Sequence, residues 1–88
     1  MSTTTRYLVL AMRRPDFDPS VIAPHLAFLD DLRARGLLEM TGGFGDGSGG
    51  AYVLRNVASL EDVQAIVAAD PLALQRTSDL VVREWHTR

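Results

Sequence analysis

The fold is decided by residues 37–56, LLEMTGGFGDGSGGAYVLRN, at the centre of the chain. Leu37–Phe44 and Ala51–Asn56 are each typical of a strand, and Gly45–Gly50 between them supplies the glycines of a hairpin loop. The two strands are therefore expected to be antiparallel. Gly42 and Gly43 would weaken an ordinary strand, so we expect a β-bulge there, or a place where backbone or ligand approaches closely.

The chain on either side of this hairpin adds one strand and one helix. Apolar residues recur from Ile22 to Leu32 at the spacing of one helical face, until Gly36 stops the helix. A second helix follows the capping residue Ser59 and ends before Asp70-Pro71, because the residue before a proline avoids the helical region. The four outer elements are thus a strand, a helix, a helix and a strand, at Arg6–Met12, about 20–35, 59–69 and Asp79–His86.

This order of elements, β-α-β-β-α-β, predicts an α+β fold of the ferredoxin-like type. Such a fold has a four-stranded antiparallel sheet with both helices on one face. The other face of the sheet is left bare. A second copy of the chain would cover it, so we expect a homodimer whose sheets pack face to face and enclose a ligand cavity.

Length and composition limit the chain to one domain, residues 1–88, because 88 residues with 47% apolar content leave no room for a second core. The absence of cysteine excludes disulfides, and two histidines without a nearby acidic cluster do not favour a structural metal. A net charge of −2 offers no basic surface for nucleic acid. The chain also lacks an apolar run of membrane-spanning length and a signal peptide, so we expect a cytoplasmic protein.

His25 and Asp70 are the residues best suited to catalysis, since each lies where a helix meets a loop. An imidazole that donates one N–H to a carboxylate is held in a single tautomer, and its other nitrogen is then free to transfer a proton. Each residue also has a structural interpretation. A histidine at a helix start is usually bonded to backbone or water, and an aspartate before a proline usually forms a turn.

Other motifs in the sequence carry less. Gly45, Gly47 and Gly50 spell GxGxxG, but a dinucleotide fingerprint needs a helix after it, and here a strand follows. Arg13-Arg14 is expected to be a solvated strand end. An RNA-recognition domain shares this strand order, yet the central strands lack the paired aromatic residues that stack on bases.

Five short segments occur in an order that is typical of one family. They are Tyr7-Leu8-Val9-Leu10, Pro24-His25-Leu26 with Leu29, Gly36-Leu37-Leu38 leading to Gly42-Gly43, Ala69-Asp70-Pro71 and Val82-Arg83-Glu84-Trp85. With these segments the chain resembles the YciI-like (YCII-related domain) proteins from about Arg6 to Trp85. The resemblance implies a ferredoxin-like subunit, a dimeric α/β barrel, and an active site at His25 and Asp70. The family includes a dehydrochlorinase of a chlorinated hydroxyhydroquinone, and its fold is similar to that of muconolactone isomerase.

Two departures from the family pattern alter the expected pocket wall. Gly42-Gly43 stands where the family usually has Gly-Pro, and Leu72 stands where an aromatic residue is common. Arg76 replaces a turn glycine, which would bring a long cation near Asp70 or near an anionic ligand. Gly42, Gly43 and Arg76 are therefore candidate substrate-binding residues.

Two classes of function remain open on the sequence. One is a small cofactor-free enzyme in which Asp70 orients His25, and His25 moves a proton during isomerisation or elimination of an enolic, cyclic or phenolic compound. The other is a binding or accessory module that uses the same dimer cavity to hold a small molecule or a partner protein, without turnover. A close approach of the His25 ring to the Asp70 carboxylate inside a closed cavity would favour the enzyme, whereas a filled cavity or side chains that point apart would favour the module.

Overall fold

Four strands form one antiparallel sheet in the computed structural model, which describes residues 2–88. They are β1 (Thr4–Arg13), β2 (Leu38–Gly43), β3 (Gly49–Leu54) and β4 (Ser78–Thr87), and their order across the sheet is β2-β3-β1-β4. All neighbouring strands are antiparallel. The predicted ferredoxin-like α+β fold is confirmed.

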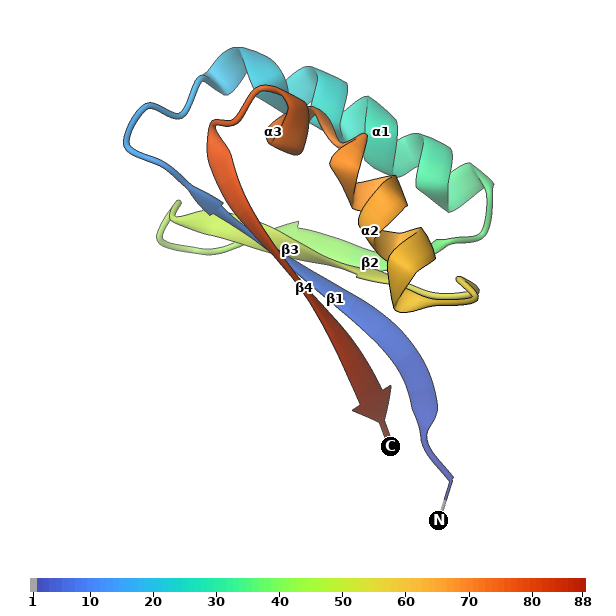
Figure 1. The fold of residues 1–88 in the computed structure, drawn as a ribbon. Helices are drawn as coiled ribbons and strands as arrows, with labels where there is room; N and C mark the ends of the chain where they lie inside the picture. The colour runs from blue at the N-terminus through green and yellow to red at the C-terminus, as the bar shows by residue number, and fades with distance from the viewer. Residues whose placement is uncertain (1) are drawn as a thin grey trace.

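The helices all lie on one side of this sheet (Figure 1). They are the 3-10 turn Pro19–Val21 and the α-helices α1 (Ile22–Ala34), α2 (Leu60–Ala68) and α3 (Pro71–Leu74). The sequence predicts α1 and α2 but not α3, because a proline after a helix is also a stop signal. Proline is equally at ease at the first position of a helix, and Pro71 opens α3 directly after α2 ends. None of the helices in residues 2–88 is long and apolar enough to cross a membrane.

The irregularities of the hairpin lie elsewhere than expected. The register between β2 and β3 shifts between Leu38 and Met40, and Gly42 and Gly43 pair regularly with Ala51 and Gly50. No bulge is present at Gly42-Gly43, but the other alternative predicted there, a close approach of backbone, is confirmed, because a Cβ at Gly50 would collide with the Gly42 carbonyl. β3 begins inside the glycine-rich segment, at Gly49. A Cβ at Gly49 would collide with the Ala11 carbonyl, and a Cβ at Gly50 would collide with the Gly42 carbonyl. The close backbone approach thus requires glycine at the start of β3.

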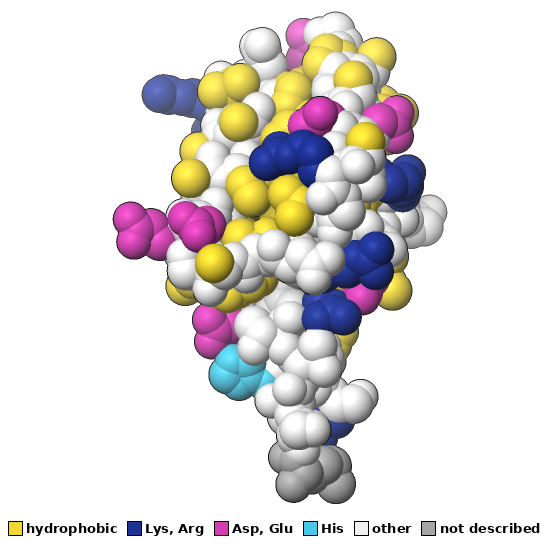
Figure 2. Space-filling view, turned by 90° about the vertical axis from the view of Figure 1, so that its right-hand side faces the viewer, with side chains coloured by type: hydrophobic (Ala, Val, Ile, Leu, Met, Phe, Trp, Pro, Cys, Tyr) yellow, Lys and Arg dark blue, Asp and Glu magenta, His cyan; other side chains and the backbone are white. Residues whose placement is uncertain are grey.

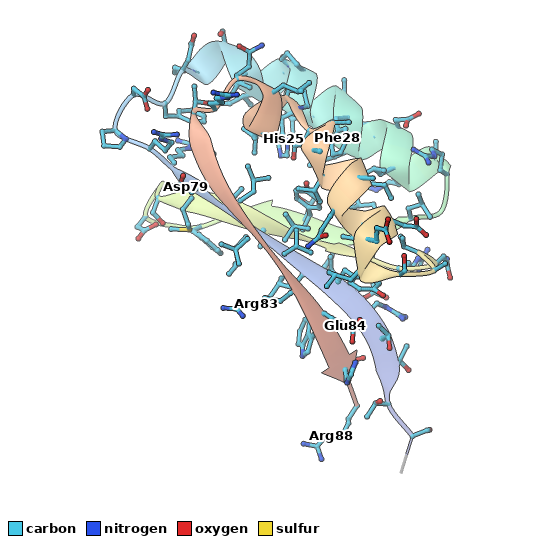
Figure 3. All side chains as sticks on the ribbon, in the orientation of Figure 1. His25, Phe28, Asp79, Arg83, Glu84 and Arg88 are labelled. Atoms are coloured by element: carbon cyan, nitrogen blue, oxygen red, sulfur yellow. The ribbon has the colours of Figure 1, made fainter. Side chains whose placement is uncertain are left out.

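The core fills the space between the helices and one face of the sheet. Side chains alternate along a strand, so every second residue of β1, β3 and β4 faces the helices. In Figure 3, Arg83 and Glu84 leave β4 on opposite sides in this way. The main buried cluster contains Tyr7, Val9, Leu29, Leu32, Leu38, Tyr52, Leu54, Val63 and Val67. A smaller cluster of Ala11, Val21 and Leu72 closes the end near α3.

One end of the β1–β4 ribbon projects beyond the rest of the sheet. Thr4–Arg6 pair only with Trp85–Thr87, because the pairing of β1 with β3 begins at Tyr7. On the face that Figure 2 draws, this tapering end carries few hydrophobic side chains. The opposite end of the ribbon lies against α3, and the candidate site is found there.

Candidate active site

His25 lies in the first turn of α1, on the side that faces α3 and the sheet (Figure 3). Pro24 precedes it in that turn, where the missing N–H of proline costs nothing because it would have no intrahelical partner. The His25 ring is half-buried, and its Nδ1 lies 2.9 Å from Asp70 Oδ1. The structure therefore brings together two residues that are 45 positions apart, at the distance expected of a hydrogen bond.

Asp70 is held by three hydrogen bonds and is completely buried. Its Oδ1 accepts from His25 and from the backbone N–H of Leu72 at 2.9 Å, and its Oδ2 accepts from the Tyr52 hydroxyl at 2.8 Å. The bond to Leu72 makes Asp70 the N-cap of α3. The turn-forming role and the contact with histidine are thus both present in one side chain.

Tyr52 is a member of the site that the sequence did not reveal. It lies on β3 with its ring toward the helices, and only 1% of it is exposed. Its ring centroid lies 6.0 Å from that of His25. Burial, followed by the negative charge of Asp70 and the hydrogen bond to it, raises the pKa of the Tyr52 phenol well above its usual range. Tyr52 therefore keeps its proton and serves as a permanent donor to Asp70.

The sequence does contain a signal for Tyr52. Tyr52 and Leu54 occupy alternate positions of a strand whose even-numbered residues face the core. A buried tyrosine hydroxyl needs a hydrogen-bond partner, and the core offers few polar groups. A tyrosine at an inward position of this strand is therefore a reason to look for a buried carboxylate opposite it.

These contacts fix the tautomer of His25. Asp70 accepts on both oxygens, so the neutral imidazole carries its hydrogen on Nδ1 and leaves Nε2 as the acceptor. Nε2 has no hydrogen-bond partner within residues 2–88. An imidazole arranged in this way can take a proton at Nε2 while the carboxylate stabilises the charged ring.

A cavity of about 230 Å³ adjoins the His25 ring. Gly42 and Gly43 line it, and Thr41, Ser78 and Arg13 add polar groups. No carboxylate of the described chain lines this cavity. The apolar part of its wall is supplied by Ala11, Phe17, Ile22, Leu26, Leu29 and Leu72.

Arg76 lies outside this site, in contrast to the expectation from the sequence. It is exposed, it does not line the cavity, and within residues 2–88 it makes no ion pair with Asp70. Both carboxylate oxygens of Asp70 already accept hydrogen bonds from other groups. Arg76 instead occupies the turn after α3 with φ of 56°, a left-handed conformation in which glycine is the usual residue.

Metal-binding groups are not gathered in the site. Within residues 2–88, no three side chains of His, Cys, Asp or Glu lie together as ligands for an ion.

Comparison with known proteins identifies the family. The model of the YCII-related domain matches residues 5–86. The chain belongs to the YCII-related domain family. A relative named "Uncharacterized protein YjpA", from Bacillus subtilis (strain 168), is 44% identical to this YCII-family chain over 79 residues, covering 90% of the chain and 92% of the relative.

A solved structure shares the fold of this YCII-family protein. It is the 5-chloro-2-hydroxyhydroquinone dehydrochlorinase TftG from Burkholderia phenoliruptrix AC1100, in complex with 2,5-dihydroxybenzoquinone. The TM-score is 0.67 with 23% sequence identity, and the match covers 91% of this chain and 92% of TftG. At this identity the similarity establishes a common fold.

Proposed function

We propose that this YCII-family protein is a small enzyme that transfers a proton on a small enolic, cyclic or phenolic compound, as an isomerase or a lyase. His25 is the proton-transfer group, and Asp70 is its positioning residue. The observation that carries the proposal is the 2.9 Å contact between His25 Nδ1 and Asp70 Oδ1 at the wall of a cavity. The remaining nitrogen of the ring is available to a substrate in that cavity.

The residues divide the chemistry between them. Tyr52 and the Leu72 N–H hold the carboxylate of Asp70, and Asp70 holds the imidazole in one tautomer. In an elimination, Nε2 accepts a proton from the substrate while the leaving group departs with its electron pair. In an isomerisation, the same nitrogen returns the proton to a different carbon. Neither reaction needs a cofactor.

TftG supplies the substrate class for a first test, since it acts on a chlorinated hydroxyhydroquinone and its structure holds a dihydroxybenzoquinone. We suggest two assays with the purified protein. One measures chloride release from 5-chloro-2-hydroxyhydroquinone, and the other measures deuterium incorporation from heavy water into 2,5-dihydroxybenzoquinone by NMR. Both report proton transfer on a small ring compound.

Substitution of the pair decides whether the activity belongs to it. His25→Ala and Asp70→Asn should each lower the rate by roughly 10²–10⁴, and the double variant should be hardly worse, because the two residues act as one unit. His86→Ala is the matched control, since His86 makes the same 2.9 Å contact with Glu84 on the exposed end of β4. Undiminished rates in folded His25→Ala would remove His25 from the proton transfer, and the absence of any turnover above background in the native protein would leave a binding module as the function.

We further propose that the bare face of the sheet is covered by a second copy of the chain. This face carries exposed Met12, Met40, Val81 and Trp85, which are 39–59% accessible. So small a domain gains much of its stability by burying such a surface.

Val81→Asp should weaken the dimer by roughly 100-fold, about 2.7 kcal/mol, in sedimentation equilibrium. Gln64→Asp, at an exposed position of α2, should not. A native chain that sediments as a stable monomer at micromolar concentration would contradict the dimer.

A further inference from the structure

Arg13 is a residue of the cavity that the proposed proton transfer does not use. It is the last residue of β1 and follows Tyr7, Val9 and Ala11 on the face of the sheet that bears the helices. Its side chain lines the same cavity as His25. The sequence suggested a solvated strand end for Arg13-Arg14, and the structure separates the two residues. Arg14 does not line the cavity, and its Nε lies 4.0 Å from Asp16 Oδ1.

Phe17 holds the Arg13 guanidinium at this position. The guanidinium carbon lies 4.3 Å from the centroid of the Phe17 ring, which is the geometry of a cation–π contact. Phe17 itself lines the cavity and packs against the small buried cluster at this end of the sheet. A turn closed by the bond from the Phe17 N–H to the Arg14 carbonyl returns the ring over β1. The cation is thus positioned by the fold.

Basic side chains line the described part of the cavity, and acidic side chains do not. Arg13 and His25 are the only cationic or titratable basic side chains that line it within the described chain, and no Asp or Glu lines it. Arg13 has no ion-pair partner within residues 2–88. Ser78, its cross-strand neighbour, adds a hydroxyl on the same wall. A guanidinium with unused donors at the edge of an apolar cavity is a binding group for an anionic oxygen.

We infer that Arg13 recognises an anionic substituent on the ligand, and that the substrate class is a single-ring compound bearing an ionised acidic group. This inference rests on the proposed function for the site but concerns binding alone. The cavity of about 230 Å³ is smaller than the pockets that hold drug-sized ligands, which begin near 300 Å³, so one ring with short substituents is the fitting size. The apolar wall contacts the ring, and Arg13 contacts the charged oxygen.

Two ligands that differ only by a carboxylate test this inference. Isothermal titration calorimetry at pH 7 would compare 2,5-dihydroxybenzoate, which is an anion, with hydroquinone, which is neutral. The native protein should bind the anion roughly tenfold more tightly, because a charge-assisted hydrogen bond to Arg13 is added. Raising the salt concentration should reduce this preference, since Arg13 is exposed.

Variants assign the preference to one side chain. Arg13→Gln should bind the two ligands about equally, while Arg14→Gln, the matched control, should keep the native preference. Phe17→Leu should give an intermediate preference, because the charge remains and only its stacking surface is lost. A native preference that survives Arg13→Gln, equal binding of both ligands by the native protein, or no binding of either would each overturn the inference.

This outcome is separable from that of the proposed reaction. If His25→Ala keeps full activity while Arg13→Gln loses the preference for the anion, the anion site stands and the proton-transfer role falls. If Arg13→Gln binds as the native protein does while His25→Ala is inactive, the reaction stands and the anion site falls.

Discussion

Two histidine–carboxylate pairs in this protein have the same length and different surroundings. The His25–Asp70 and His86–Glu84 contacts both measure 2.9 Å. The side chains of the first pair are 16% and 0% exposed, and those of the second are 58% and 43% exposed. A distance alone therefore does not make a site. Burial, a second donor on the carboxylate and a cavity at the free nitrogen distinguish His25–Asp70.

The largest expected difference between the pairs is in stability. Asp70→Ala removes the cap of α3 and leaves the Tyr52 hydroxyl without an acceptor in a buried site. The free energy of unfolding should fall by about 2–4 kcal/mol, since a lost cap and a buried unsatisfied donor each cost about 1–2 kcal/mol. Glu84→Ala should change it by less than about 0.5 kcal/mol, as surface pairs contribute little. Urea denaturation measures both.

Equal losses in Asp70→Ala and Glu84→Ala would break the comparison. They would mean that solvent enters the site around Asp70 and replaces the missing acceptor. Melting of the active-site region without loss of the rest of the fold would have the same meaning, and hydrogen exchange at the Leu74 amide, which donates to the Asp70 backbone carbonyl, would detect it.

A smaller effect is expected from Tyr52, the donor that the exposed pair lacks. Tyr52→Phe should lower the free energy of unfolding at pH 8 by about 1–2 kcal/mol, because a buried hydrogen bond to a carboxylate is lost. It should also change the response to alkali. The pKa of Tyr52 is raised in the folded protein, so above its ordinary value of 10.0 the unfolded chain loses this proton and the folded chain keeps it.

The folded protein should therefore lose stability as the pH rises. The contribution of Tyr52 to stability is fully present below pH 10 and decreases as the pH rises above it. Urea midpoints measured from pH 8 to 11 should therefore fall more steeply for the native protein than for Tyr52→Phe. Parallel curves would show that the buried phenol is not retained in its protonated form.

The sequence predicts most of the fold and half of this site for physical reasons that particular residues illustrate. The spacing of strands and helices follows from local periodicity, and His25 and Asp70 stand out because their side chains suit proton transfer near helix ends. Tyr52 and Arg13 were missed because their roles depend on which face of a strand they occupy and on what the chain later brings opposite them. Arg76 was misplaced because nearness in sequence to Asp70 says nothing of direction, and the turn after α3 keeps its side chain out of the cavity.

The smallest effect on the protein is expected from substitutions in the wall of the cavity. This cavity lies at the free nitrogen of His25, and it is the last feature that distinguishes His25–Asp70 from His86–Glu84. Gly43 pairs with Gly50, so a side chain there points toward the helices, whereas one at Gly42, opposite Ala51, points to the bare face. A Cβ at either position meets no atom closer than 3.8 Å, and neither glycine needs a positive φ.

Gly42→Val and Gly43→Val should both leave the free energy of unfolding within about 1 kcal/mol of native. Only Gly43→Val should fill the cavity and weaken binding of 2,5-dihydroxybenzoate, by roughly three- to tenfold, about 0.7–1.4 kcal/mol. The nitrogen-15 shifts of His25 should be unchanged in both variants. Equal loss of binding in the two variants would mean that the ligand site includes the bare face, and loss in neither would place it away from His25.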